Sequence, residues 1–303
     1  QKNVIKCLAY CNPSCEIDIF TKVKQSVLRD YLGSSANYIE FYNLIQTEKT
    51  IDGSLDISAT KTMFENWSKS LNSWCDGVFS RIDINTKIIV SDSVPQASLI
   101  ARKLKIPCIF IQHFTWDWLY QELYGKDDIF DSLNKLYKES SLMMFPPLTP
   151  VKNIHLHPNY EKLGYIVNQE LVMASRSHVD NISNREILLM NNGTNSASMV
   201  IEKILQGFPV IQDVKLLVRY DILTAKAKKY ALQRNDVTLL QTVRETHEKL
   251  CSSNIIVARG GYNTLSEIMV LNKTALIMSE EFNPEFESNI ALCKDEYKFI
   301  KCT

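Results

Sequence analysis

The sequence predicts an α/β fold built from two doubly wound domains in tandem. Short apolar runs alternate with stretches of helical period along all 303 residues. A proline-rich stretch and then a polar one separate two halves that repeat this alternation. The length suggests about two domains, and a hydrophobic content of 45% allows each of them to bury a core. We expect the first domain to span residues 1–174 and the second to span residues 175–303.

The first half is expected to begin with a strand, a helix, a strand and a helix, over residues 4–10, 17–32, 38–45 and 62–74. A clearer unit follows, in which the apolar runs "KIIVSD" and "IPCIFIQ" flank "SVPQASLIARKLK", whose apolar residues recur at helical spacing. This pattern predicts a strand, a helix and a second, parallel strand, with both strands buried on both faces. Ser93 and Gln96 are typical of a capping box at the start of that helix, with Pro95 in the first turn.

The second half repeats the same alternation. Its strands are expected at residues 187–190, 213–220, 237–240, 254–258 and 274–278, with helices at 197–207, at 244–251 and in the segment that ends at Leu271. A loop, "NNGTNS", lies between the first of these strands and the first helix.

The composition excludes several classes of partner. Lys plus Arg number 34 and Asp plus Glu number 34, so no net charge attracts the chain to nucleic acid. No apolar run approaches the roughly 20 residues that a membrane-spanning helix needs, although peripheral contact with a membrane stays open. We expect a cytoplasmic protein, because no signal peptide is visible. The chain begins with Gln1 rather than Met, which is compatible with a fragment of a longer protein.

The eight cysteines are scattered along the chain, and Cys7 and Cys108 fall inside predicted strands. We interpret them as reduced thiols rather than a disulfide framework. The spacing of the cysteines in "CLAYCNPSC" fits neither a zinc site nor an iron–sulfur cluster, so no metal site and no cofactor is predicted.

The stretch "ARGGYNTLSE" lies between an apolar strand and a helix. Open α/β sheets bind ligands at the carboxyl ends of their strands, where glycine lets the backbone approach a phosphate and a helix N-terminus offers N–H groups. Gly260 and Gly261 provide such a turn, with the helix expected to start near Asn263 or Thr264 and Glu267 in its first turn. Glu267 could accept hydrogen bonds from a ribose diol. Alternatively, Thr264 and Glu267 form a capping box that needs no ligand.

From "NIIVARGGYNTLSEIMVLNKTALIM" to "SEEFNPEFESNIALCKDE", the sequence resembles the nucleotide-binding half of GT-B glycosyltransferases. The likeness is to the lipid-linked N-acetylglucosaminyltransferase of peptidoglycan synthesis, which has a glycosyltransferase family 28 C-terminal domain, and it covers roughly residues 187–296. The resemblance implies two Rossmann-like domains with a cleft between them. It also implies a nucleotide-sugar site that is formed by Gly193, Thr194, Arg259, Gly260, Gly261, Asn263, Thr264, Glu267, Glu285 and Asn289.

Within that site, the resemblance implies that Glu267 binds the ribose and that the turn from Gly260 to Thr264 binds the phosphates. Glu285 and Asn289 fall where the family contacts the donor sugar, although the family often has Gln at the position of Glu285. The sequence therefore leaves the identity of the donor open.

In the first half, "IIVSDSVPQASLIARKLKIPCIFIQHFTWDWLY" resembles the N-terminal domain of a GT-B-like group that includes the glycosyltransferase-like domain attached to arabinokinases. The resemblance implies that Asp92 and the run from His113 to Asp117 face the cleft, with His113 and Asp92 as candidate catalytic residues. A helix cap for Asp92 and aromatic packing for the tryptophans are the alternatives. The family's glycine-rich loop after the first strand, with its histidine, is replaced here by "CNPSCEID".

These expectations predict a glycosyltransferase of the hexosyltransferase type. It would transfer a sugar from a nucleotide-diphosphate donor, UDP-linked by the resemblance, to an unknown acceptor without a metal. Two alternatives stay open: a nucleotide-sugar hydrolase of the same fold, in which water replaces the acceptor, and a non-catalytic relative that only binds the nucleotide sugar.

Overall fold

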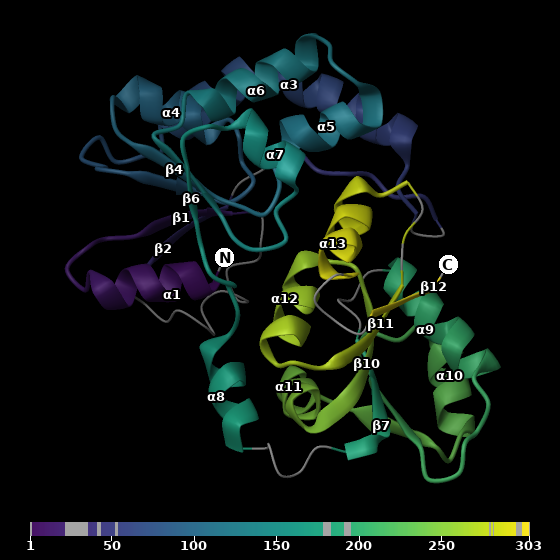
Figure 1. Cartoon of the computed structure of the whole chain (residues 1–303). Helices are drawn as coiled ribbons and strands as arrows, with labels where there is room; N and C mark the ends of the chain where they lie inside the picture. Colours follow the sequence, from purple (N-terminus) through teal and green to yellow (C-terminus); the bar gives the residue numbers. More distant parts are fainter. Residues whose placement is uncertain are drawn as a thin grey trace. The chain divides into compact units, whose positions relative to one another are not determined.

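The computed structural model describes residues 2–21, 36–40, 44–51, 54–177, 183–190, 195–278, 280, 282–294 and 299–302. The chain divides into two compact units (Figure 1). The first contains Gln1–Gln46, Lys61–Pro146 and Lys152–Ile166, and the second contains Thr47–Thr60, Pro147–Val151 and Val167–Thr303. The second unit therefore includes two short segments from the first half of the chain. A domain boundary after residue 174 stays a prediction.

A four-stranded parallel sheet forms the centre of the first unit. Its strands pair in chain order, β3 (Ile89–Ser91), β4 (Cys108–Ile111), β5 (Leu142–Phe145) and β6 (Tyr160–Lys162). The described residues of this part of the chain form the helices α1 (Lys2–Cys11), α3 (Ile57–Phe79), α4 (Ala97–Leu104), α5 (Trp116–Tyr124), α6 (Asp128–Lys138) and α7 (Val151–Leu156). The unit predicted over residues 87–112 is confirmed as β3, α4 and β4, and its two strands are parallel. The expectation that both strands are buried on both faces is wrong for β3, because its middle residue Val90 is 38% exposed.

Aromatic side chains fill the core of the first unit. Phe64 of α3 is fully buried, and its ring centroid lies 4.9 Å from that of Tyr120 and 5.9 Å from that of Trp116, both edge-on. Phe110 of β4 and Tyr137 of α6 form a similar pair at 5.0 Å. Because edge-to-face contacts are a preferred geometry for buried rings, the aromatic residues of α5 are held in one arrangement.

Three expectations in the first half are wrong. Residues 4–10 lie in the helix α1 rather than in a strand, since the partly buried Val4, Ile5 and Ala9 recur on one helical face. Residues 18–21, expected to be helical, form β1 (Asp18–Thr21), which pairs with β2 (Asn37–Glu40), while 22–35 lie outside the described residues. The capping box at α4 is also absent, because the helix begins at Ala97 and its N-cap residue Gln96 makes no side-chain cap.

A six-stranded parallel sheet forms the second unit, in the spatial order β12-β11-β10-β7-β8-β9. The strands are β7 (Ser183–Leu189), β8 (Lys215–Arg219), β9 (Val237–Leu240), β10 (Ser253–Arg259), β11 (Thr274–Met278) and β12 (Phe299–Cys302). Numbered along the chain from β7, this is the 3-2-1-4-5-6 order of the Rossmann fold. The strands and the α9 and α11 helices predicted for this half are thereby confirmed, with shifted ends.

Helices cover both faces of this sheet, with α11 (Val243–Ser252) and α12 (Tyr262–Val270) on one side and α9 (Asn195–Gly207) and α10 (Ala225–Gln233) on the other (Figure 1). Two further helices are α8 (Gln169–Ser177) and α13 (Pro284–Lys294). The central strands are apolar on both faces, and Leu188, Val218 and Ile256 are fully buried. This burial explains why the sequence reads as continuous apolar runs in this half.

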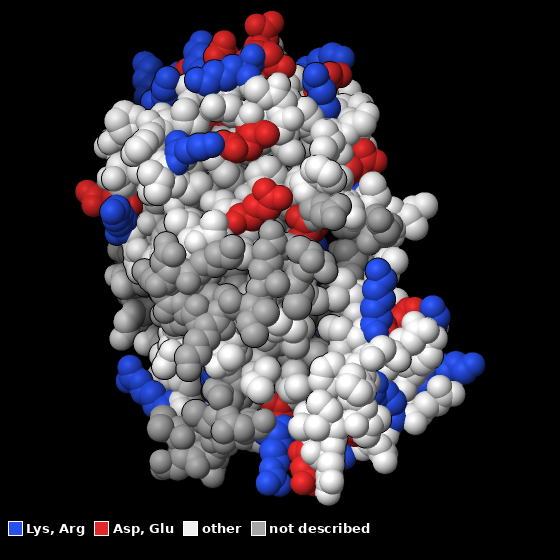
Figure 2. Space-filling view, turned by 45° about the vertical axis from the view of Figure 1, so that its right-hand side comes forward, with Lys and Arg blue, Asp and Glu red and all other residues white. Residues whose placement is uncertain are grey.

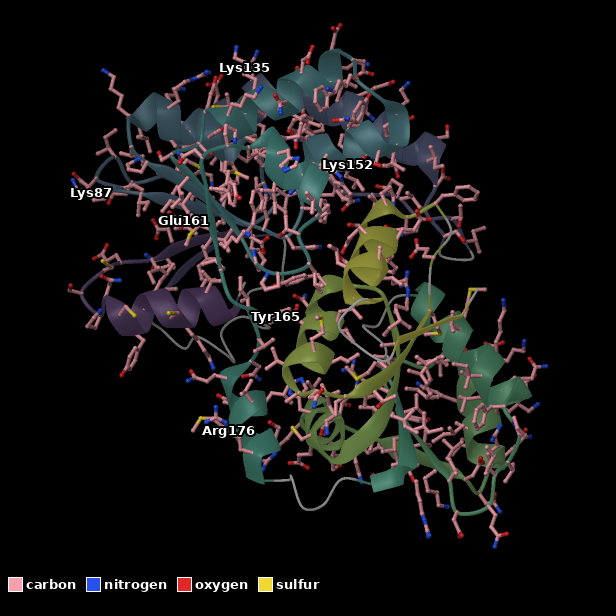
Figure 3. All side chains as sticks on the ribbon, in the orientation of Figure 1. Lys87, Lys135, Lys152, Glu161, Tyr165 and Arg176 are labelled. Carbon is pink, nitrogen blue, oxygen red and sulfur yellow. The ribbon has the colours of Figure 1, made fainter. Side chains whose placement is uncertain are left out.

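Charges of both signs are mixed on the surface. On the face shown in Figure 2, Lys and Arg side chains are interspersed with Asp and Glu, and the described residues there form no extended patch of one sign. Lys87, Lys135 and Lys152, labelled in Figure 3, are exposed side chains of the first unit, and Lys152 pairs with Glu122 at 3.2 Å. This mixture is in keeping with the net charge of zero.

Among the described residues, the cysteines at positions 7, 11, 15, 75, 108, 251 and 293 are free thiols. Burial raises the pKa of Cys108 to about 12, so this thiol is inert at neutral pH. Among the described residues, no group of three or more His, Cys, Asp or Glu side chains is arranged to hold a metal ion. None of the described helices is both long enough and apolar enough to cross a membrane.

A buried polar cluster surrounds Asp117 in the first unit. Its carboxylate accepts hydrogen bonds of 2.8 Å from the Trp118 N–H and from Nδ2 of Asn134, and Nε2 of the buried His157 lies 3.3 Å from its Oδ2. Burial by itself raises the pKa of Asp117, but the contact with His157 and the hydrogen bonds outweigh it and hold the pKa below its ordinary value. Asp117 is fully buried and so serves the core, where the sequence predicted a residue facing a cleft.

We expect Asp117→Ala to lower the free energy of unfolding by about 3–5 kcal/mol at neutral pH, because it leaves the polar groups around the carboxylate unpaired. The pKa of Asp117 is lower in the folded state, so its contribution is present above the unfolded pKa and is lost as pH falls through the folded pKa. Urea unfolding measured at several pH values should therefore show a weaker loss of stability in acid for the variant than for the wild type. Parallel acid limbs for the two proteins would contradict this assignment.

Candidate functional site

The strand order of the second unit defines where a ligand can bind. The chain runs outward from β7 to β8 and β9, and then returns to the other side of β7 with β10. In open parallel sheets the crevice at such a reversal, at the carboxyl ends of the two strands, is the usual ligand site. The Gly260–Gly261 turn follows β10 at this point, whereas residues 191–194, which come after β7 in the chain, are not among the described residues. Gly193 and Thr194 lie outside the described residues.

The Gly260 position cannot carry a side chain without rearrangement. A Cβ atom there would lie 3.2 Å from Cδ1 of Ile290 and 3.3 Å from Cβ of Phe286, both on α13. The Gly260 carbonyl also accepts a 3.0 Å hydrogen bond from Nδ2 of the fully buried Asn289. The glycine therefore lets α13 pack directly on the turn, and Asn289 fixes the turn in place. Contact between Asn289 and a donor sugar stays a prediction.

Gly261 is the N-cap residue of α12, which begins at Tyr262 and thus slightly before the predicted start. The first hydrogen bond of the helix runs from the Leu265 N–H to the Gly261 carbonyl, at 3.1 Å. Gly261 has no side chain with which to cap the N–H groups of the first turn, which leaves the end of α12 open to a ligand. The helix dipole makes this end attractive to an anion, and the exposed Asn263 and half-buried Thr264 lie in the same turn.

Glu267 is the sixth residue of α12 and lies in its second turn, so the expected place in the first turn is wrong. For the same reason Thr264 cannot be the N-cap residue of a capping box with Glu267. A capping box whose second bond is shifted by one residue occurs at α11: Thr242 Oγ1 accepts from the Glu245 N–H at 3.1 Å, and Glu245 accepts at 2.9 Å from the N–H of Gln241, the residue before the N-cap. The structure therefore removes the capping explanation for Glu267.

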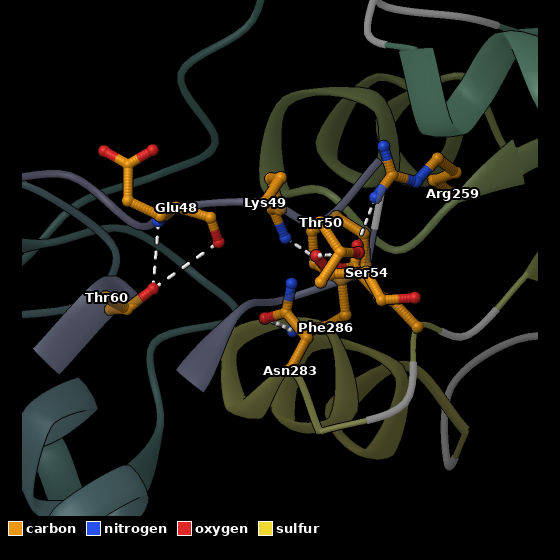
Figure 4. Close-up of polar contacts among 9 residues, drawn as sticks. Glu48, Lys49, Thr50, Ser54, Thr60, Arg259, Asn283 and Phe286 are labelled. Carbon is orange, nitrogen blue, oxygen red and sulfur yellow. Dashed lines mark hydrogen bonds and ion pairs between the residues drawn. The ribbon is translucent and has the colours of Figure 1, made fainter. Parts of the chain in front are cut away.

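Arg259, the last residue of β10, contacts Glu280 and Phe286. Its guanidinium pairs with Glu280, which follows β11, and lies over the ring of Phe286 at 5.0 Å from the centroid. Glu280 also pairs with Lys49, and Figure 4 shows both cations reaching this one carboxylate. Sequence reasoning found Arg259 but missed Lys49 and Glu280. An acid directly after the apolar run "TALIM" is a signal that could have identified Glu280, whereas no local pattern marks Lys49.

The start of α13 lies against the same turn. Asn283 precedes the helix and its Oδ1 accepts from the Phe286 N–H at 3.3 Å, which caps the first turn (Figure 4). Glu285 lies in that first turn and is half-buried. Carboxylates are favoured at this end of a helix by the dipole, so the position of Glu285 is stable without a ligand. Its contact with a donor sugar stays a prediction.

The two candidate catalytic residues lie in the first unit, at the carboxyl ends of neighbouring parallel strands. Asp92 follows β3 and is exposed, and the half-buried His113 follows β4. Asp92 does not cap α4, whose N-cap residue is Gln96, so the capping alternative is wrong. The adjacent Ser93 has a φ of 57° and is held by Oε1 of Gln112, which accepts from its N–H at 3.1 Å.

The run after β4 is mostly interior. Phe114, Thr115, Trp116 and Asp117 are all buried, and of the predicted run only His113 is partly accessible. The indole of Trp116 donates to the Ser93 carbonyl at 2.8 Å, so this tryptophan supports the loop that carries Asp92. The expectation that the whole run faces a cleft is therefore wrong, because its aromatic residues are needed in the core.

Solved structures with a similar backbone cover nearly the whole chain. Phytolacca americana UGT2 complexed with UDP-2fluoro-glucose and pterostilbene matches 100% of this chain and 82% of its own, with a TM-score of 0.60 and 12% identity. Acinetobacter baumannii MurG matches 99% and 81%, with a TM-score of 0.54 and 14% identity. UDP-glucose: anthocyanidin 3-O-glucosyltransferase in complex with UDP matches 99% and 81%, with a TM-score of 0.56 and 11% identity.

These likenesses show that the chain has the GT-B fold, with two Rossmann-like domains. The predicted fold class is thereby confirmed. No protein-family model and no curated protein matches the sequence.

The two glycines of the turn allow a matched test of the packing. We expect Gly260→Ala to lower the free energy of unfolding by about 1–3 kcal/mol, because the added methyl group collides with α13. A Cβ atom at Gly261 would lie 3.9 Å from the Phe286 ring, an ordinary contact, so Gly261→Ala should stay within about 1 kcal/mol of the wild type. Chemical denaturation of both variants checks this, and equal effects would show that α13 does not pack as described.

Proposed function

We propose that the chain is a glycosyltransferase that takes its sugar from a nucleotide-diphosphate donor, and that the donor is UDP-linked. The observation that carries the proposal is the reversal of strand order between β7 and β10, which puts the Gly260–Gly261 turn and the N-terminus of α12 at the ligand-binding edge of the sheet. The similar structures support UDP as the nucleotide, because two of those described above were solved with UDP or a UDP sugar.

In this proposal the diphosphate lies at the N-terminus of α12. Gly261 leaves the helix end open, and the backbone N–H groups of the first turn point out of it toward the phosphates. Glu267 lies five residues after Tyr262, about 7.5 Å further along the helix axis. A carboxylate one and a half turns from the phosphates is placed to accept hydrogen bonds from the ribose hydroxyls of the same nucleotide.

The transfer needs an acceptor hydroxyl to attack the anomeric carbon as the bond to the diphosphate breaks. The negative charge that develops on the leaving diphosphate is stabilised by the helix end and its N–H groups, so this proposal requires no metal. A base within hydrogen-bond reach must remove the proton of the acceptor hydroxyl, and His113 is our candidate, with Asp92 at the next strand end. We assign the acceptor to the first unit and the donor to the second unit.

A thermal-shift experiment with UDP tests the donor site. UDP at about 100 times its dissociation constant should stabilise the protein by roughly 2.7 kcal/mol, which raises the melting temperature by several degrees. Glu267→Ala should weaken UDP binding by roughly 1.5–3 kcal/mol, because it removes a charged hydrogen-bond acceptor of the ribose. GDP and UDP-N-acetylglucosamine, measured in parallel, identify the base and the contribution of the sugar.

Glu245→Ala is the matched control, since Glu245 stands in the same Thr-x-x-Glu pattern but caps α11. It should lower the melting temperature of the free protein and leave the UDP-induced shift unchanged. The proposal fails if no nucleotide shifts the wild type, or if both glutamate variants respond alike. Release of free sugar from the donor without any acceptor would show that the site hydrolyses the donor rather than transferring its sugar.

A further inference from the structure

A hairpin from the first half of the chain forms part of the second unit. In residues 47–60, Lys49 and Leu55 form an antiparallel bridge, and the Asp56 N–H donates to the Glu48 carbonyl at 3.0 Å. Thr50 closes the hairpin, because its N–H donates to the Ser54 carbonyl, also at 3.0 Å. Lys49 therefore projects from an ordered element rather than from a loose connection.

The base of this hairpin is fixed to the start of α3. Oγ1 of Thr60 accepts from the Glu48 N–H at 2.9 Å (Figure 4), and Oδ1 of Asp56 accepts from the Ala59 N–H at 2.9 Å, as an N-cap does. Both contacts lie within the part of the chain that belongs to the second unit. The position of Lys49 is thus determined before any ligand binds.

Lys49 and Arg259 converge on the carboxylate of Glu280. Arg259 ends β10 and pairs in register with Met278, so Glu280 follows at the same edge of the sheet. The Glu280 side chain is 8% exposed and that of Arg259 is 13% exposed, whereas that of Lys49 is 36% exposed. A buried anion is therefore held between a guanidinium and a half-exposed ammonium group, directly beside the Gly260 turn.

An open hollow of about 690 Å³ adjoins this ion-pair cluster. It is lined by Met199 of α9, the next described helix after β7, and by five residues of the hairpin: Lys49, Thr50, Ile51, Ser54 and Asp56. The hairpin thus reaches the helix after β7, while its Lys49 reaches Glu280, which follows β11 and pairs with Arg259 at the end of β10. The order of the sheet reverses between β7 and β10.

The chemistry of the cluster suits phosphate. Arginine binds carboxylate and phosphate through the same pair of parallel N–H bonds, and lysine binds either as a point charge. A diphosphate carries more negative charge and more acceptor oxygens than one carboxylate, so it can take the place of Glu280 between the two cations.

We propose that Lys49 and Arg259 bind the diphosphate of the donor, and that Glu280 occupies this place as an internal anion until the donor displaces it. The inference rests on the proposed function, and it adds to the donor site a residue that lies 210 positions before Arg259 in the chain. If the cluster serves only to fix the hairpin, changing its charges alters stability but not anion affinity.

Titration calorimetry with inorganic pyrophosphate and with UDP separates these two cases. Glu280→Gln keeps the shape of the side chain and removes the competing charge, so it should bind both probes roughly tenfold more tightly than the wild type. Lys49→Gln should bind both roughly tenfold more weakly. Lys249→Gln is the matched control, because Lys249 is 34% exposed and pairs with Glu186 in the same unit; its affinities should equal those of the wild type.

The inference is overturned if Lys49→Gln binds both probes like Lys249→Gln, or if Glu280→Gln binds them no more tightly than the wild type. Should Glu280→Gln fail to fold, Lys49→Gln still decides, since it alters a half-exposed side chain. If the affinity for UDP depends on Glu267 but not on Lys49 or Glu280, the proposed function is supported and this inference is wrong. The variants could change the affinity for pyrophosphate as expected while the protein binds no UDP. That result would support anion binding by Lys49 and Arg259 and contradict the proposal that the donor is a UDP sugar.

Discussion

The conformation of the Gly260–Gly261 turn, where we propose that the donor binds, depends on the close approach of α13 to Gly260. Because position 260 has no side chain, Phe286 and Ile290 pack against the backbone of the turn, and Asn289 bonds to its carbonyl from the same helix. The same packing brings the Phe286 ring under the guanidinium of Arg259. A larger residue at this one position would separate the helix from the turn and disturb all of these contacts together.

Two copies of one short pattern show why context decides what a motif does. Thr242 to Glu245 and Thr264 to Glu267 both read Thr-x-x-Glu before a helical stretch, yet only the first forms a capping box. The second is displaced because Gly261 takes the N-cap position and α12 begins two residues before Thr264. Glu267, which takes no part in a capping box, lies about one and a half turns into α12, and the N-terminus of α12 lies where the order of the strands reverses.

Much of the architecture could be predicted from sequence, because parallel strands buried on both faces leave continuous apolar runs such as those of β4 and β10. The amino-terminal segment could not, since the β-branched Val4 and Ile5 are typical of strands although they lie in the helix α1. The Gly260 turn was predictable from local chemistry. Lys49 was not, because its partner Glu280 lies 231 residues away in the chain and no local pattern indicates the contact.

The buried charges at this edge are difficult to explain by stability alone. Removing a carboxylate and a guanidinium from water is costly, and well-packed apolar residues usually stabilise a fold at least as well as a buried ion pair. Arg259 nevertheless ends β10 and Glu280 follows β11, at positions where apolar residues could have continued the core. Fold stability therefore does not explain why these two side chains are charged. An anion that exchanges with the carboxylate of Glu280 provides one, since the two cations then retain a partner in both states.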